Sequence, residues 1–88
     1  MEEVKDIIEF DYSELRGKIR AVFGSEDKFA DAMELSKVSL SAKLNNQVGF
    51  KQKEILKACD LLDILYEFIP VYFFTKKVSI SKLEEGDY

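Results

Sequence analysis

Residues 29–46, FADAMELSKVSLSAKLNN, contain two short helical patterns that are separated by only three residues. The first pattern is formed by Phe29, Ala30 and Met33. In the second, Leu40 and Leu44 are four residues apart and predict the buried side of another short helix. The break, Glu34-Leu35-Ser36, places an apolar residue under the turn and a serine where it can cap the second helix. The sequence therefore predicts two helices joined by a tight turn.

The second of these helices, expected over about residues 36–45, leaves one side without an apolar anchor. That side carries Lys37, Val38, Ser41, Ala42 and Asn45. Val and Ala are unusual choices for a surface that meets only water, so we interpret this side as a contact surface. The alternative is the ordinary solvent-exposed face of a short helix.

Residues 13–23 predict the first helix of the domain. Its apolar face would be formed by Leu15, Ile19, Val22 and Phe23. Asp11 or Ser13 can cap its start, and Ser25 can cap the helix that follows. Gly17 lies inside the first helix, where it costs about 1 kcal/mol relative to Ala, which suggests close packing against another backbone at that position.

Two more helices are expected later in the chain. One runs from about residue 51 to residue 62, with Ile55, Cys59 and Leu62 turned inward. A short fifth helix follows at residues 64–69, and Pro70 either breaks it or allows one further turn. We expect the Cys59 thiol to be buried and inert, with a redox switch as the alternative.

The last third of the chain is rich in aromatic residues. We expect a core cluster, or alternatively a dimer contact, formed by Tyr66, Phe68, Tyr72, Phe73 and Phe74. Residues 76–88 are expected to form a short, partly ordered arm, with a strand or disorder as alternatives. At the other end, Ile7, Ile8 and Phe10 are expected to pack onto the domain.

Composition excludes several classes of function. The 88 residues fit a single domain (residues 1–88, core about 10–75), and no His and one Cys leave no histidine base, zinc site or disulfide framework. We expect no catalytic residues, no metal and no cofactor, and hence no enzyme. No stretch approaches the roughly 20 apolar residues of a membrane span, and the acidic N-terminus does not resemble a signal peptide, so a cytoplasmic location is expected.

The formal net charge of −4 conceals an uneven distribution. Residues 1–12 carry five acids and one Lys, and residues 58–75 carry three acids and no base. Residues 13–57 carry nine bases and six acids, and within residues 35–57 five Lys stand against Glu54 alone. Phosphate binding requires local positive charge, so the middle of the chain is the predicted nucleic-acid-binding region.

Two helices joined by a short turn, the second with an outward polar face, have the helix-turn-helix layout. Through FADAMELSKVSLSAKLNN and on into KQKEILKACDLLDI, the sequence resembles the lambda-repressor-like family of bacteriophage Cro and CI regulators. It is most similar to a group of small phage proteins whose sequences read FDYSELRGKI and, near the end, YFF. The resemblance spans roughly residues 10–75 and implies an all-α, five-helix DNA-binding domain that acts in a bacterial host cell.

Four positions differ from the usual pattern of this family. Glu34 and Asp63 stand where the family often has Gly, which implies a left-handed backbone at both positions. Glu26 stands where relatives often have a Gln that supports DNA contact, and an acid there opposes a nearby phosphate. Lys51 stands where Ser or Thr would normally cap the fourth helix.

The resemblance also implies which side chains meet DNA, with the recognition helix at about residues 36–45 in the major groove. Base edges would be contacted by Lys37, Val38, Ser41 and Ala42. Phosphates would be contacted by Ser36, Lys43, Asn45, Asn46, Gln47, Lys51 and Lys53. Lys37 would donate to guanine, and Val38 or Ala42 would touch a thymine methyl group. A plain polar loop is the alternative interpretation of residues 45–47.

Together these observations predict a sequence-specific DNA-binding regulator of phage or prophage origin that acts on a double-stranded operator. So small a domain would normally gain specificity as a homodimer, for which the aromatic C-terminal third is the available surface. The alternative is an antirepressor or another protein-interaction module that keeps the fold without affinity for DNA. The pI of 4.8, Glu26 and Glu34 favour that alternative.

Overall fold

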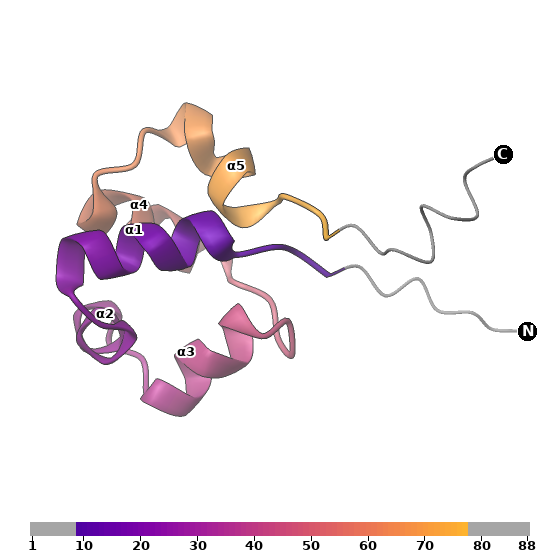
Figure 1. The fold of residues 1–88 in the computed structure, drawn as a ribbon. Helices are drawn as coiled ribbons and strands as arrows, with labels where there is room; N and C mark the ends of the chain where they lie inside the picture. Colours follow the sequence, from indigo (N-terminus) through magenta and orange to yellow (C-terminus); the bar gives the residue numbers. More distant parts are fainter. Residues whose placement is uncertain (1–8, 78–88) are drawn as a thin grey trace, which may run out of the picture.

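The computed structural model describes residues 9–77, and the regular structure within them is helical (Figure 1). The elements are α1 (Ser13–Phe23), α2 (Glu26–Met33), α3 (Lys37–Leu44), α4 (Gln52–Leu62), the 3-10 turn η1 (Tyr66–Phe68) and α5 (Ile69–Phe73). In Figure 1, α1 lies between the α2–α3 pair and α5. The predicted all-α fold with five helices is confirmed.

The turn between α2 and α3 forms as the sequence predicts. Ser25 and Ser36 cap α2 and α3, because each hydroxyl accepts a hydrogen bond from the backbone N–H three residues later, at 3.2 and 3.0 Å. Glu34 ends α2 in the left-handed region at φ 64°, and Asp63 ends α4 in the same region at φ 58°. A residue with a Cβ costs about 1 kcal/mol in this conformation, so both turns carry some strain.

Asp11 holds the start of α1. Its carboxylate accepts hydrogen bonds from the hydroxyl and from the backbone N–H of Ser13. These two bonds, the hydroxyl bond first, lower the pKa of Asp11. Neither of the two expected residues is the N-cap, which is Tyr12; Asp11 instead supplies an acceptor from one residue earlier, and the bounds predicted for this helix are confirmed.

The core lies where α1, α2 and α4 meet, and α5 closes it. Its most deeply buried large side chains are Leu15, Ile19, Phe29, Leu40, Cys59, Leu62 and Phe73. The inner faces predicted for α2, α3 and α4 are confirmed. Burial, and then the nearby Asp60 carboxylate, raise the pKa of the Cys59 thiol.

Two expectations for α1 are wrong. Val22 is 48% exposed. In the last turn of α1 it is Phe23 that contacts the core, because its ring centroid lies 5.4 Å from that of the buried Phe29. Gly17 is not a point of close backbone approach, since a Cβ built there would meet no atom within 4 Å. It lies on the side of the helix opposite Leu15 and faces outward.

The segment after α4 also differs from the prediction. Pro70 does not break a helix; α5 begins at Ile69 with Pro70 in its first turn, where the missing N–H costs no helical hydrogen bond. Of the expected aromatic core cluster, Phe73 is buried. Outside the core lie the exposed Tyr66, Phe68 and Phe74 and the half-buried Tyr72. The apolar pattern of the sequence predicts one continuous helix here. The 3-10 turn has fewer residues per turn than an α-helix, so it changes which residues of the segment face the core.

The two ends of the described chain lie side by side (Figure 1). Phe10 and Lys76 form an isolated antiparallel bridge, and the Lys77 N–H donates to the Glu9 carbonyl at 3.0 Å. The Phe10 ring packs edge-on against Phe74 at a centroid distance of 5.6 Å, so the predicted packing of Phe10 onto the domain is confirmed. The predictions for Ile7, Ile8 and residues 78–88 lie outside the described residues.

Candidate functional site

Leu40 and Leu44, which are 2% and 3% exposed, hold α3 on the body of the domain. The helix itself lies at the lower edge of the molecule in Figure 1. Its outer side carries the exposed Lys37, Val38 and Ser41 and the partly exposed Ala42. The four residues predicted to contact bases therefore share one accessible side, with Val38 78% exposed, and their contact with DNA stays a prediction.

A hydrogen-bonded network at the C-terminal end of α3 ties this helix to α1. Arg16 Nη1 pairs with Glu26 Oε2 at 2.6 Å. Arg16 Nη2 donates to the Leu44 carbonyl at 3.3 Å and to Asn45 Oδ1 at 3.1 Å. A guanidinium at this end of a helix satisfies a carbonyl that has no intrahelical donor and complements the helix dipole. Arg16 therefore positions α3.

The same network gives two predicted site residues an internal role. Glu26, an acid expected to oppose a phosphate, is instead the partner of Arg16. The amide of Asn45, a predicted phosphate contact, bridges Arg16 and the Ser41 hydroxyl, to which its Nδ2 donates at 3.2 Å. Both side chains are committed to holding the helix in place.

Lys43, another predicted phosphate contact, lies in the interior at 7% exposure. Its ammonium is 3.1 Å from Glu54 Oε1 and 3.3 Å from the Gly49 carbonyl. Partial burial raises the pKa of Glu54, but hydrogen bonds from the Lys51 N–H and from Lys43, with the charges of both lysines, more than offset it, and the net pKa is lowered. Lys43 is thus unavailable to a phosphate, because α4 places an acid opposite it.

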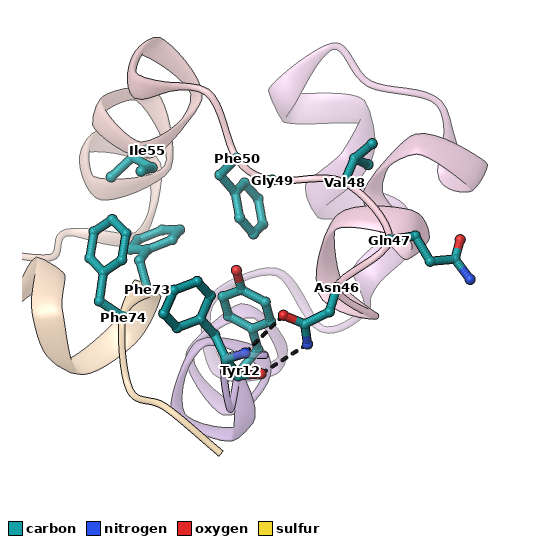
Figure 2. A pocket seen from close by; sticks show the side chains of 10 residues that line it. Tyr12, Asn46, Gln47, Val48, Gly49, Phe50, Ile55, Phe73 and Phe74 are labelled. Atoms are coloured by element: carbon teal, nitrogen blue, oxygen red, sulfur yellow. Dashed lines mark hydrogen bonds between the residues drawn. The ribbon is translucent and has the colours of Figure 1, made fainter. Parts of the chain in front are cut away.

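Asn46 is engaged beside a cavity, where Figure 2 shows its amide in two hydrogen bonds. Its Nδ2 donates to the Phe10 carbonyl at 3.0 Å, and its Oδ1 accepts from the Phe10 N–H at 2.8 Å. The residue has φ 65°, a conformation that Asn tolerates better than most residues. This amide therefore holds the N-terminal segment rather than presenting itself to a phosphate.

The cavity has a volume of about 330 Å³, and half of the residues that line it are aromatic (Figure 2). It is lined by Phe10, Tyr12, Asn46, Gln47, Val48, Gly49, Phe50, Ile55, Phe73 and Phe74. Burial raises the pKa of the Tyr12 phenol, which contributes to one wall. The cavity thus forms where the start of the described chain, the α3–α4 loop and the end of α5 meet.

The remaining predicted contacts are exposed, and one of the three lysines among them faces an acid. Lys37 Nζ lies 3.4 Å from Asp27 Oδ2, and both side chains are about two-thirds exposed. Lys51 and Lys53 are exposed, as are Ser36 and Gln47. An exposed pair is weak, so Lys37 can leave Asp27, but any anion that it meets also meets this acid.

A second exposed surface lies at the opposite end of the molecule from α3, on η1 and the start of α5 (Figure 1). Its large apolar side chains are Leu65, Tyr66, Phe68 and Val71, which are 62%, 56%, 45% and 45% exposed. Exposed apolar residues grouped in one segment are typical of binding surfaces. The sequence predicts only part of this surface, because Tyr66 and Phe68 belong to the aromatic cluster for which a dimer contact is the alternative interpretation.

Two other kinds of site are absent from residues 9–77. No group of three or more potential metal ligands forms there, and no helix there has the length and apolarity needed to cross a bilayer.

Comparisons with known proteins identify the family. The family described as Protein of unknown function (DUF739) matches residues 8–76, so the chain belongs to it. The chain is also similar to a solved structure, the modulator of repression (MOR) of the temperate bacteriophage TP901-1 from Lactococcus lactis, with 47% identity and a TM-score of 0.69 over 80% of this chain and 95% of that one. Among curated proteins no match was found. The predicted similarity to phage proteins is confirmed, and membership of the Cro and CI family stays a prediction.

Proposed function

We propose that this chain, as a member of the DUF739 family, is a phage regulatory protein that acts by binding a repressor protein. The observation that carries the proposal is the 47% identity, over 80% of its length, to a phage protein described as a modulator of repression. The alternative drawn from the sequence, a protein-interaction module on this fold, is therefore preferred to a direct reader of an operator.

The charges around α3 support a protein partner. Binding to a phosphate backbone depends on several cations, each of which releases counterions. Here Lys43 is buried and Lys37 faces the Asp27 carboxylate, so two of the lysines predicted to contact DNA are poorly placed to bind an anion. A protein interface instead combines apolar and polar groups, and the exposed Leu65 and Phe68 on either side of the exposed Glu67 fit that composition.

The test is binding between the purified chain and the repressor of the same phage or prophage, measured by isothermal titration calorimetry. We expect a saturable isotherm, and a change in the repressor's binding to its own operator when the chain is added. No heat of binding at concentrations well above the micromolar range would contradict the proposal.

A second candidate function is sequence-specific DNA binding through α3. It is favoured by the exposed Lys37, Val38 and Ser41 on a capped, firmly anchored helix, with Lys51 and Lys53 as phosphate contacts. A mobility shift with DNA from the phage regulatory region at low salt tests it. Binding that weakens with salt and is lost in Lys37→Glu would support this function.

The matched control for that assay is Arg20→Glu, which makes the same charge change at an exposed position of α1. It should leave DNA binding nearly unchanged if α3 is the contact. The absence of any shift at low salt would exclude the second candidate.

A further inference from the structure

Three exposed apolar residues in the segment formed by the N-cap of η1, η1 itself and α5 follow one another at a regular spacing. Leu65, Phe68 and Val71 stand three residues apart and are 62%, 45% and 45% exposed. Leu65 is the extended N-cap of η1, so the single 3-10 turn places Leu65 and Phe68 at its two ends, and an interval of three residues gives neighbours on the α-helix that follows. We call these three residues the C-terminal stripe.

The stripe is held in place by its own segment. Ile64 and Phe73, 6% and 1% exposed, anchor the segment before and after the stripe. The Phe68 N–H donates to the Leu65 carbonyl at 2.9 Å and closes the 3-10 turn. The segment therefore buries one side in the core and presents the stripe on the other, preorganised for a partner.

The segment that carries the stripe is acidic along the chain. Residues 58–75 contain Asp60, Asp63 and Glu67 and no Lys or Arg. Glu67 lies within the segment of the stripe and Asp63 two residues before it, and both are exposed. Neither carboxylate forms an ion pair with another residue of the described part of the chain. A complementary partner must therefore bring both apolar surface and positive charge.

We infer that the C-terminal stripe is a docking surface for an amphipathic helix of a protein partner, with apolar residues along one face and Lys or Arg beside it. The inference rests on the proposed function only for the identity of that partner, the repressor. A second copy of this chain is a poorer occupant, because two-fold pairing of the stripe would bring the like-charged Glu67 and Asp63 of both copies together.

Calorimetry with the repressor tests the inference through variants at exposed positions. The double variant Leu65→Ser/Phe68→Ser removes two apolar anchors and should weaken binding by about tenfold or more. Glu67→Lys reverses the charge beside the stripe and should weaken binding by about threefold to tenfold. Val22→Ser, at an exposed apolar residue of α1 that belongs to neither candidate surface, is the matched control and should stay within about twofold of the wild type.

The outcomes separate the two proposals. If the wild type binds the repressor and the double variant binds equally well, the stripe is not the docking surface, while the proposed function stands. If the wild type sediments as a dimer that the double variant abolishes, the occupant is a second copy and the inference is overturned. Unchanged thermal midpoints in all variants ensure that loss of binding is not loss of folding.

If the wild type does not bind the repressor, the proposed function fails and a synthetic probe decides the inference. The probe is a helical peptide of about 18 residues with a Leu face flanked by Lys, compared with a counterpart flanked by Glu. We expect NMR shift changes at residues 65–71 with the Lys peptide alone, and their loss in the double variant. Binding of neither peptide, or of both equally, overturns the inference.

Discussion

The α3 side and the C-terminal stripe are both exposed, yet their side chains are in opposite states. On the α3 side, polar groups are engaged within the molecule: Lys43 pairs with Glu54, and Asn45 meets Arg16. In the stripe, apolar side chains stand in solvent, with Leu65 62% exposed. The sequence suggests a basic surface in the first region and a core in the second; the structure buries Lys43 but leaves Lys37, Lys51 and Lys53 exposed, and it buries Phe73 but leaves most of the other aromatic side chains exposed.

The comparison shows that charge counted along a sequence differs from charge at a surface. Lys43 contributes to the basic middle of the chain, but its ammonium forms an ion pair with Glu54 inside the molecule. Conversely, the apolar sequence of residues 58–75 predicts core, but all three acids and several large apolar side chains of this segment are exposed. The proposed protein partner is inferred from the side chains that are exposed and not from the charge counted along the sequence.

The largest expected effect separates a buried from an exposed aromatic residue of the segment formed by η1 and α5. Phe73→Ala should lower the free energy of unfolding by about 3–5 kcal/mol, because it leaves a cavity in the core. Phe68→Ala should change it by less than about 0.5 kcal/mol, since the ring is exposed. Urea denaturation followed by circular dichroism measures both, and equal losses would make the stripe part of the core and remove the contrast.

The interior pair on the α3 side comes next. Glu54→Gln leaves the Lys43 ammonium buried without its counter-charge and should lower the free energy of unfolding by about 1–3 kcal/mol at neutral pH. The matched control Glu67→Gln removes an exposed acid and should have almost no effect on stability. If Glu54→Gln leaves the free energy of unfolding unchanged, Lys43 is not a buried cation that depends on Glu54, and it would be available to bind an anion.

The same pair sets a pH dependence. The pKa of Glu54 is lowered from its ordinary value of 4.5, so its contribution to stability is complete above that value and is lost as the pH falls through the lowered pKa. The stability difference between the wild type and Glu54→Gln should therefore shrink on acidification below about pH 4.5. Urea titrations at a series of pH values measure it, and a difference that grows toward acid would contradict this electrostatic role.

The network at the end of α3 gives an intermediate effect. Arg16→Lys keeps the charge but cannot reach Glu26, the Leu44 carbonyl and Asn45 together, and should cost about 1–2 kcal/mol. The backbone amide NMR shifts of Arg16→Lys should differ from those of the wild type along α3 as well as near the substitution. Arg20→Lys, on the same helix, is the matched control, and similar α3 shifts in both variants would remove the positioning role of Arg16.

The smallest effects concern the two left-handed turns. Glu34→Gly should raise the free energy of unfolding by up to about 1 kcal/mol, because Gly has no Cβ penalty at φ 64° and the exposed pair of Glu34 with Lys57 is weak. Asp63→Gly should gain only a few tenths of that, since Asp tolerates this conformation better. Thermal unfolding resolves the order, and a loss of stability in both would contradict the strain.

Local features were predictable from the sequence, and contacts across helices were not. The serine caps and the strained turn at Glu34 depend on neighbouring residues, and the structure matches them. The burial of Lys43 depends on where α4 places Glu54, which the periodicity of α3 does not contain. The exposure of Phe68 depends on a 3-10 turn that breaks the helical phase before Pro70. The DNA contacts predicted for Lys37 and its neighbours stay predictions.

The central claim is that a protein partner engages this domain at the C-terminal stripe and not at α3. Hydrogen–deuterium exchange of the chain, with and without the repressor of the same phage, tests it most directly because both regions are measured in one experiment. We expect slower exchange on binding in residues 65–74 and little change in residues 36–45. Protection confined to residues 36–45 would contradict the claim.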